Sequence, residues 1–258
     1  MIDTHSHIYA EEFDDDRREA LDRAWAAGVE ALMLPDIDSE SRERMFDLAR
    51  QYPDRCFPMV GLHPTSVNDN AKWRDEIDTV ERLLRERPMP LYGVGEIGLD
   101  LYWSKDFYRE QREALHAQLE LAIEHNLSVA IHTRSAYDEM LDALATYRGR
   151  ALRGVMHAYA DSAERARDIT RLGDFVFGIG GVVTFKNSGL DRVVAELPAE
   201  LLVVETDCPY LTPVPHRGKR NESSYVEFVC RKIAELHGRS VEEIDAITTA
   251  TARRIFAL

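Results

Sequence analysis

The sequence predicts a (β/α)8 barrel, an α/β fold of the TIM-barrel type, and three observations support this prediction. Short apolar segments alternate with longer amphipathic segments along the whole chain. Eight of the apolar segments have the length and composition of strands, and eight parallel strands close a barrel. The chain has 258 residues, and single barrels of this type commonly run to about 250 residues.

The segments expected to form strands are rich in Val, Ile and Leu and alternate little with polar residues. This composition is typical of strands that are buried on both faces of a parallel sheet. The predicted strands are residues 1–3, 29–34, 57–62, 91–96, 127–132, 154–157, 175–180 and 201–206. An open doubly wound sheet usually carries a Gly-rich turn after its first strand, whereas histidines follow the first strand here.

The segments between these strands have helical patterns. The predicted helices are residues 14–27, 39–51, 73–87, 106–125, 136–147, 162–172 and 189–197. Two further helices, at 223–237 and 241–257, are expected to end the chain, and Ser240 and Glu243 have capping-box spacing at the start of the second. No linker, repeat or low-complexity segment interrupts the pattern, so we expect one domain over residues 1–258.

Composition narrows the class of protein. The chain is 45% hydrophobic and 30% charged, which is typical of a folded protein with a sizeable core. It lacks an apolar run of about 18 residues, so we expect no membrane span, and its first residues lack the basic and apolar regions of a signal peptide. Cys56, Cys208 and Cys230 form neither a disulfide framework nor a CxxC motif, which favours the cytoplasm.

Charge excludes one class of nucleic-acid-binding protein. The formal net charge is −14 and the pI is about 5.1, so the chain is not a globally basic binder. A nuclease that holds phosphate through metal ions and a few local cations is compatible with this charge.

Histidines and carboxylates lie at or just past the ends of the predicted strands, where the active sites of barrels form. These residues are His5, His7, His63, Glu96, His132, His157, Glu205 and Asp207. His5 and His7 are two apart on a strand, so both side chains point to the same face. Imidazoles and carboxylates are ligands for zinc and manganese, and together they predict a metal site.

Structural roles are the alternative for these residues. Glu96 would then belong to a buried ion pair, and His132 and His157 would be core histidines, although burial without a partner is costly. Asp3 would be either a turn residue or a partner of a ligand histidine. The three histidines on predicted helices, His116, His125 and His237, are expected to be structural.

A set of motifs resembles one family over nearly the whole chain. The motifs are IDTHSH at 2–7, GLHPT at 61–65, GEIGLD at 95–100, IHTR at 131–134, GVMHAY at 154–159, IGGVVTFKN at 179–187, VETDCPYLTP at 204–213 and RGKRNE at 217–222. In this order they resemble the TatD family of metal-dependent deoxyribonucleases, within the amidohydrolase superfamily. The resemblance agrees with the barrel predicted above.

The resemblance implies a site with two divalent metal ions. The implied ligands are His5, His7, Glu96, His132, His157 and Asp207. Glu96 would bridge the two ions and Asp207 would face the attacking water, so these two are the expected catalytic residues. The metal itself stays open among zinc, manganese and magnesium, of which magnesium is the least suited to histidine ligands.

The activity implied is hydrolysis of ester bonds, with a metal-activated water that cleaves phosphodiesters as a 3′–5′ exodeoxyribonuclease. The alternatives are an ester or amide hydrolase, such as a D-aminoacyl-tRNA deacylase or a small phosphoesterase, and a non-catalytic metal-binding barrel. The chain departs from the family's pattern at residues 101–103 and 158–161. These segments flank the predicted site, so the substrate stays open.

Five residues are expected to contact the substrate: His63, Arg134, Tyr159, Arg217 and Lys219. Arg134 offers a bidentate phosphate contact. Arg217 and Lys219 belong with Arg220 to a basic segment, which alternatively is a solvated charged loop. Tyr102, Trp103 and Tyr159 either stack on unpaired bases or pack the loops around the site. The expected partner is a nucleic acid or another phosphoester, with no membrane and no obligate protein partner.

Overall fold

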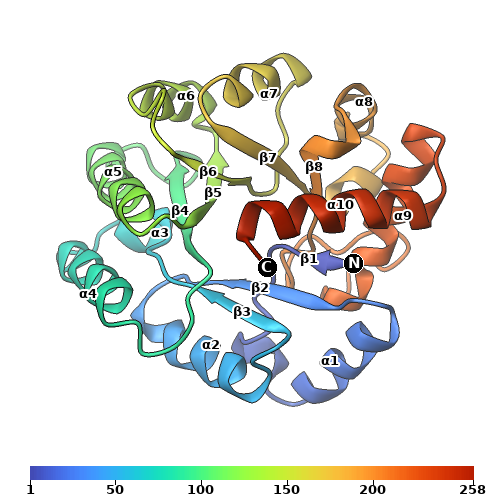
Figure 1. The fold of residues 1–258 in the computed structure, drawn as a ribbon, viewed down its shortest axis with the longest axis horizontal. Coiled ribbons are helices and arrows are strands. Elements are labelled where there is room, and N and C mark those ends of the chain that lie inside the picture. Colours follow the sequence, from blue (N-terminus) through green and yellow to red (C-terminus); the bar gives the residue numbers. More distant parts are fainter.

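Strand pairing closes eight parallel strands into a barrel in the computed structural model, which describes residues 1–258 (Figure 1). One ladder runs β1–β2–β3 and a second runs β4–β5–β6–β7–β8. Two single parallel bridges join the ladders, one between Val60 and Val94 and one between Ser6 and Cys208. The predicted barrel is therefore confirmed.

Each strand overlaps one of the predicted strands. The strands are β1 (Ile2–Asp3), β2 (Ala31–Pro35), β3 (Cys56–Met59), β4 (Gly93–Asp100), β5 (Ser128–Arg134), β6 (Arg153–Met156), β7 (Asp174–Ile179) and β8 (Leu202–Val204). The largest difference is in β4, which continues past the predicted end at residue 96 to Asp100. All eight residues of β4 are buried.

The predicted helices surround the barrel (Figure 1). They are α1 (Arg17–Ala26), α2 (Ser39–Gln51), α4 (Trp73–Glu86), α5 (Tyr108–Glu124), α6 (Tyr137–Ala145), α7 (Ala163–Thr170) and α8 (Leu190–Glu196). The short α3 (Pro64–Val67) was not predicted, because a single turn of four residues shows no helical periodicity.

Two helices end the chain, as predicted: α9 (Val226–His237) and α10 (Val241–Phe256). The predicted start of α9 differs, since residues Ser223–Tyr225 form a separate 3-10 turn. The capping box of α10 is confirmed. Ser240 Oγ accepts a hydrogen bond from the Glu243 amide at 3.1 Å, and the Glu243 carboxylate accepts one from the Ser240 amide at 2.9 Å.

The last helix closes one end of the barrel. Ile255 and Phe256 of α10 pack with side chains that point into the barrel from the strands, among them Met33 and Val155. The helix lies over the amino ends of the strands, where the hydroxyl of Ser128, the first residue of β5, donates to the Ile255 carbonyl. In Figure 1 it crosses the barrel on the near side. The carboxyl ends of the strands therefore lie at the opposite end.

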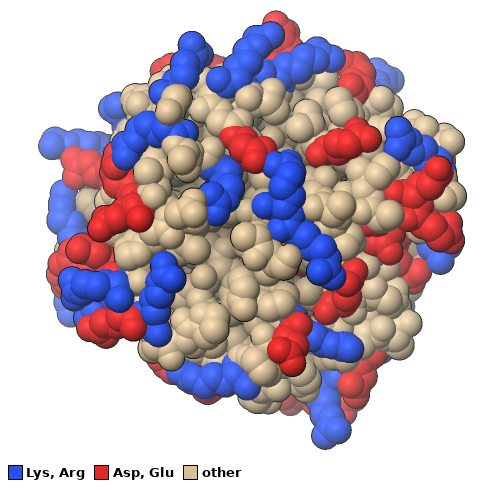
Figure 2. All heavy atoms as spheres, viewed as in Figure 1, with Lys and Arg blue, Asp and Glu red and all other residues tan.

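Charged side chains of both signs cover the face that α10 occupies. Figure 2 shows this face, with basic and acidic side chains interspersed and no continuous basic surface. Two ion pairs on it join Arg253 to Glu30 at 2.6 Å and Arg254 to Asp174 at 2.5 Å. Every helix of the structure is too short or too polar to cross a lipid bilayer.

Candidate metal centre

A cavity of about 830 Å³ opens at the carboxyl ends of the strands, within the size range of small-molecule sites. Its lining includes seven of the eight histidines and carboxylates that the sequence places at strand ends: His7, His63, Glu96, His132, His157, Glu205 and Asp207. His5 lies beneath them and is fully buried. The fold thus brings together side chains from six different strands or strand ends, as the barrel prediction requires.

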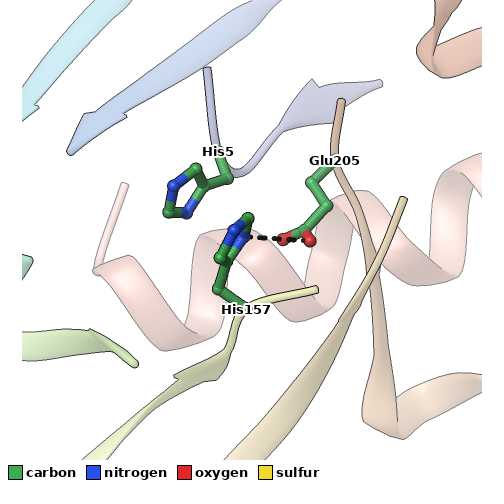
Figure 3. A group of neighbouring side chains, drawn as sticks. All are labelled: His5, His157 and Glu205. Atoms are coloured by element: carbon green, nitrogen blue, oxygen red, sulfur yellow. Dashed lines mark ion pairs between the residues drawn. The ribbon is translucent and has the colours of Figure 1, made fainter. Parts of the chain in front are cut away.

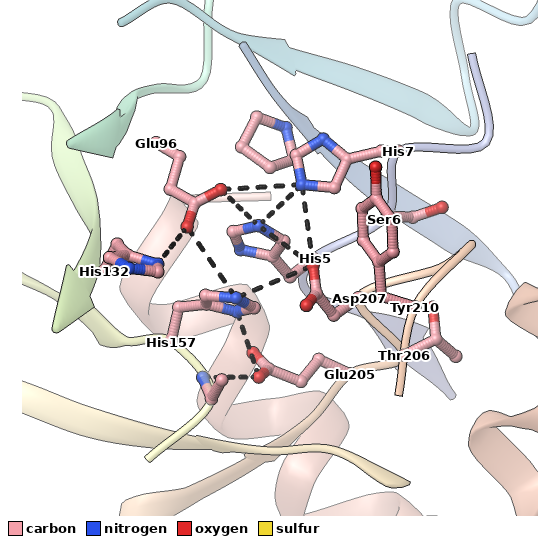
Figure 4. Close-up of polar contacts among 12 residues, drawn as sticks. His5, Ser6, His7, Glu96, His132, His157, Glu205, Thr206, Asp207 and Tyr210 are labelled. Atoms are coloured by element: carbon pink, nitrogen blue, oxygen red, sulfur yellow. Dashed lines mark hydrogen bonds and ion pairs between the residues drawn. The ribbon is translucent and has the colours of Figure 1, made fainter. Parts of the chain in front are cut away.

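His5, His7 and Glu96 form the deepest group. His5 Nε2 lies 3.1 Å from His7 Nε2 and 3.1 Å from Glu96 Oε2, and His7 Nε2 lies 3.5 Å from the same oxygen (Figure 4). The other nitrogen of His7 is held by the Tyr9 hydroxyl at 2.8 Å. Two ring nitrogens and a carboxylate oxygen that converge so closely fit the ligand spacing of about 3.3 Å around a tetrahedral zinc ion.

The other oxygen of Glu96 faces a second group of imidazoles. Glu96 Oε1 lies 2.9 Å from His132 Nδ1, 3.4 Å from His63 Nε2 and 3.8 Å from His157 Nε2. His132 Nε2 in turn lies 3.0 Å from Asp100 Oδ2. Glu96 therefore stands between two sets of histidines, with one oxygen toward each.

His157 lies at the centre of the cluster and is oriented by Glu205 (Figure 3). Its Nδ1 lies 3.0 Å from Glu205 Oε1, and that oxygen also accepts a hydrogen bond from the Ala158 amide at 2.6 Å. The His157 ring stacks on His5, with 3.4 Å between ring centroids. Its Nε2 is thereby directed between Glu96 and Asp207, which lie 3.8 Å and 3.7 Å away.

Asp207, three residues past the end of β8, closes the cluster. Its Oδ1 lies 3.6 Å from His7 Nε2 and 3.9 Å from His5 Nε2 (Figure 4). Its backbone adopts the left-handed region at φ 56°, which is uncommon for a residue other than glycine. The Asp207 amide donates to the His5 carbonyl at 2.9 Å, so the two residues are joined through the backbone as well.

Buried charges perturb the pKa values of the cluster. Burial lowers the pKa of His5 well below its usual value, and His157 adds to this effect. Burial alone would raise the pKa of Glu96, but His63, His5 and His157 hold it well below its usual value. Burial raises the pKa of Asp207, and the nearby histidines only partly oppose it. Such concentrated perturbation is typical of functional sites.

Local backbone features place Glu96 and His132. The pairing of β4 with β5 shifts register between Val94 and Ile97, so that Glu96 lies in an irregular part of the strand. Such irregularities often redirect a side chain near a site. Gly98 follows at φ 154°, and a Cβ atom there would lie 1.9 Å from the His132 carbonyl oxygen. A residue with a side chain would therefore separate β4 from β5 beside His132.

A buried carboxylate supports the site from below. Asp3, on β1, accepts a hydrogen bond from the Thr206 amide at 2.9 Å and another from the Thr206 hydroxyl at 2.6 Å. Asp3 thereby joins β1 to the segment that carries Asp207. It contacts no ligand-type side chain directly, so its place in the structure is that of a support for the backbone.

The donor atoms fit a divalent metal. Three groups have ligand atoms within 4.8 Å of one another: His5, His7 and Glu96; His63, Glu96 and His132; and His5, His157 and Glu205. Within them, His5 Nδ1 and Glu205 Oε2 are buried and have no hydrogen-bond partner. Buried polar atoms normally have a hydrogen-bond partner. Atoms that lack one and could act as metal ligands therefore favour a bound cation at this place.

The predicted substrate residues divide into two sets. His63, Arg134 and Tyr159 line the cavity, whereas Arg217 and Lys219 do not. His63 lies among the metal-ligand candidates, and Tyr159 is buried with its hydroxyl donating to the Ser162 carbonyl at 2.6 Å.

Two residues of the basic segment after β8 are occupied by contacts with other parts of the chain. Arg220 pairs with Asp16 at 2.7 Å, and Arg217 stacks on Phe185 at 3.8 Å from the ring centroid. Lys219 is exposed. Arg217 and Lys219 therefore lie outside the cavity, where only a longer substrate would meet them.

Sequence reasoning assigned no role to Asp100 or Tyr210, and gave Glu205 only a place at a strand end. Asp100 was missed because the predicted strand stopped at residue 96, although the apolar pattern of Ile97 and Leu99 continues to it. Tyr210 lines the cavity, and in Figure 4 its ring stands beside Asp207 and His7. No sequence signal separated this tyrosine from an ordinary loop residue.

Comparisons with known proteins agree with this site. Residues 2–257 match the family model described as TatD related DNase. The chain is 38% identical to the uncharacterized metal-dependent hydrolase YabD of Bacillus subtilis, over 100% of this chain and 99% of the relative. It is 31% identical to the 3′-5′ ssDNA/RNA exonuclease TatD of Pectobacterium parmentieri, over 100% of both chains. The crystal structure of YJJV, a TatD homologue from Escherichia coli, superposes with a TM-score of 0.91 at 28% identity, over 100% of this chain and 98% of that one.

Proposed function

Since the chain belongs to the TatD-related DNase family, we propose that it is a metal-dependent hydrolase that removes nucleotides from the 3′ end of single-stranded DNA or RNA. Relatives that are 30–31% identical over their whole length carry the name 3′-5′ ssDNA/RNA exonuclease. The proposal rests on this sequence similarity and on the candidate metal ligands, histidines and carboxylates, at the mouth of the barrel. Buried, reduced Cys56, Cys208 and Cys230 support a cytoplasmic location.

One observation carries the proposal of two ions: Glu96 turns its two oxygens toward different sets of imidazoles. Oε2 faces His5 and His7, while Oε1 faces His63, His132 and His157. A carboxylate in this position suits a bridge between two divalent ions. His5 and His7 would hold one ion, and His132 and His157 the other, with Asp207 beside both. The histidine-rich donor set favours zinc or manganese over magnesium.

The residues of the chain divide the chemistry among them. Bound divalent ions would supply Lewis-acid activation of water and neutralisation of phosphate charge. Asp207 is placed to accept the proton of the attacking water, because burial raises its pKa and its Oδ1 faces the middle of the cluster. It would then return the proton to the leaving 3′ oxygen of the strand. Arg134, exposed at the mouth, would hold a non-bridging phosphate oxygen.

The test follows the stepwise shortening of a 5′-labelled single-stranded oligonucleotide as nucleotides leave its 3′ end. Manganese, magnesium or zinc is added in turn. We expect rates that depend on the metal, that vanish with a chelator, and that fall by about 100-fold or more in Asp207→Ala. Asp142→Ala is the matched control, since Asp142 is exposed on α6. It should keep the wild-type rate.

Two results would overturn the proposal. One is undiminished release of nucleotides in the presence of the chelator. The other is hydrolysis of a D-aminoacyl-tRNA or an aryl phosphate at a kcat/KM that exceeds the value for every oligonucleotide, which would instead assign the metals to that bond.

A further inference from the structure

The large exposed apolar side chains of this protein lie in two segments beside the cavity, and three of them line it. The large hydrophobic residues that are exposed are Tyr102 at 57%, Trp103 at 68%, Tyr210 at 53%, Leu211 at 40% and Val214 at 45%. Tyr102 and Trp103 directly follow β4, and the other three follow β8. Exposed apolar clusters of this kind mark binding surfaces more often than exposed residues that lie singly.

These two segments lie on opposite sides of the mouth. In the closed order of eight strands, β4 and β8 are four positions apart in either direction, which is the largest separation that the barrel allows. Trp103 lines the cavity from one side, and Tyr210 and Leu211 line it from the other. Tyr210 stands beside Asp207, one of the candidate metal ligands (Figure 4). We call these candidate ligands, His5, His7, Glu96, His132, His157 and Asp207, the metal-ligand cluster.

On the β4 side, aromatic rings and a cation form one surface. The rings of Tyr102 and Trp103 are 5.1 Å apart and nearly perpendicular. The Arg134 guanidinium lies over both, 3.8 Å from the Tyr102 centroid and 5.4 Å from that of Trp103. We call Tyr102, Trp103 and Arg134 the aromatic wall. Its cation stacks on rings rather than pairing with a carboxylate, so its charge is available to a ligand.

The aromatic wall is fixed to the metal-ligand cluster by its backbone. The Leu101 amide donates to the Arg134 carbonyl at 2.9 Å, and the Tyr102 amide donates to Asp100 Oδ1 at 3.0 Å. The other oxygen of Asp100 faces His132. The wall therefore keeps a defined position relative to the place where a phosphodiester would be cleaved.

We propose that the aromatic wall binds unpaired bases of the strand upstream of the scissile phosphodiester, and so selects single-stranded over double-stranded substrate. The inference rests on the proposed function and names the part of the substrate that this part of the site recognises. A terminal nucleotide occupies the cavity beside Tyr210, and the strand leaves past Trp103. One or two upstream bases stack on Tyr102 and Trp103, while Arg134 meets the phosphate that joins the first of these nucleotides to the terminal nucleotide.

The chemistry of the wall identifies the ligand. Exposed aromatic faces accept any unstacked base, and a neighbouring guanidinium accepts phosphate. A chain with a net charge of −14 would otherwise repel a polyanion. Bases in a duplex are already stacked and paired, so they offer no face to Trp103. The wall also predicts a dependence on length, because a small phosphodiester has no upstream base to reach it and a dinucleotide has only one.

The experiment separates stacking from simple apolar contact. Trp103→Phe keeps an aromatic face, whereas Trp103→Leu keeps apolar surface without one. The measured quantity is kcat/KM for a single-stranded pentanucleotide divided by kcat/KM for a small phosphodiester, on the same preparation. We expect this ratio to fall about tenfold in Trp103→Leu, mainly through KM, and by less than threefold in Trp103→Phe. Val214→Ala is the control, since Val214 is exposed but does not line the cavity.

A binding measurement distinguishes failure of this inference from failure of the proposed function. In the Asp207→Ala background, the Kd of a labelled pentanucleotide is measured by fluorescence anisotropy with and without Trp103→Leu. A tenfold rise in Kd together with a loss of preference for single strands supports the inference. An equal Kd for both proteins overturns the inference even when the wild type degrades oligonucleotides. A wild type that binds single strands through Trp103 but releases no nucleotide would retain the inference and overturn the proposed function.

Discussion

Glu96 illustrates how much the centre depends on single side chains. Its two oxygens serve different imidazoles, so no other residue of the cluster can take its place. Around it, two ligand candidates are themselves held by a carboxylate, His132 by Asp100 and His157 by Glu205. Carboxylates that orient metal-binding histidines commonly matter for affinity almost as much as the ligands do.

Glu205 offers a test of this orientation. Glu205→Gln keeps the shape of the side chain and an oxygen for the Ala158 amide, but it removes the negative charge that faces His157. We expect about 10- to 100-fold weaker metal binding, measured by competition with a chromogenic chelator. Circular dichroism of the metal-free protein would check that the variant is folded.

The matched control is Glu196→Gln, which removes a charge from an exposed position at the end of α8. It should bind metal as the wild type does. Equal affinities for Glu205→Gln and Glu196→Gln would show that the contact between Glu205 and His157 does not support a metal ligand.

At this scale the sequence predicted residue types and their place, but not their contacts. His5, His7, Glu96, His132 and His157 could be predicted because the ends of barrel strands converge whatever the loops do. The partners of a given imidazole nitrogen could not, since they depend on side-chain rotation and on register. Asp100 is the clearest case, because its role depends on how far β4 extends.

At the scale of elements, the contact between β4 and β5 is the most constrained part of the barrel. Gly98→Ala would bring a Cβ atom to 1.9 Å from the His132 carbonyl oxygen, whereas nothing lies within 4 Å of a Cβ at Gly149. Both glycines have a positive φ, 154° and 83°. Gly149→Ala therefore reports backbone strain alone, at about 1 kcal/mol.

We expect Gly98→Ala to lower the free energy of unfolding by about 1–3 kcal/mol more than Gly149→Ala does, the size of an overpacking penalty. It should also reduce nuclease activity, because relief of the clash displaces His132. Denaturant titration and the oligonucleotide assay measure the two effects. Equal stabilities for the two variants would mean that β4 and β5 separate easily here.

The sequence predicted which segments form helices and strands more reliably than it predicted where each one begins and ends. Buried strands and amphipathic helices have distinct apolar patterns, and α2 was predicted at its observed limits, Ser39–Gln51. The single turn of α3 and the extension of β4 have no periodicity of their own. They arise from tertiary contacts, such as the two hydrogen bonds that Gln111 of α5 makes with the backbone of Asp100.

At the scale of the whole molecule, the barrel consists of two strand ladders joined by single bridges. This raises the question whether the two ladders unfold together. Two isolated bridges, Val60–Val94 and Ser6–Cys208, pair the β1–β3 ladder with the β4–β8 ladder. Further backbone hydrogen bonds join the ladders at both places, such as the one from the Thr4 amide to the Val204 carbonyl at 3.0 Å. In addition, α10 packs on β1 and also on β6 and β8, so it links both ladders. We therefore propose that residues 1–258 form one domain.

One cooperative unfolding transition is the expected result for the metal-free protein. Of the three tryptophans, Trp25 and Trp73 lie on α1 and α4, and Trp103 is exposed after β4. In Trp103→Phe the tryptophan fluorescence therefore reports on the part of the chain around the first ladder. Circular dichroism reports on the whole. Coincident midpoints in urea would support one domain, and an earlier fluorescence transition would show that the first part unfolds separately.

The distribution of charge leads to a final prediction about salt. The face that α10 occupies carries charges of both signs (Figure 2). Arg134 is the one lysine or arginine of the cavity lining, and we expect Arg217 and Lys219 to be the further phosphate contacts outside it. Each phosphate neutralised on a single strand contributes about −0.7 to the slope of log K against log salt. Three contacts therefore predict a slope of about −2, far shallower than that of a basic nucleic-acid binder.

The slope is measured from the Kd of a labelled oligonucleotide between about 50 and 300 mM potassium chloride, in the Asp207→Ala background. Arg217→Ala should make it shallower by about 0.7, the effect of one phosphate contact. A pentanucleotide too short to reach Arg217 should show no such change. A slope steeper than about −4 would require about six phosphate contacts, twice the number that these three cations supply, and would place the strand on a surface other than the mouth of the barrel.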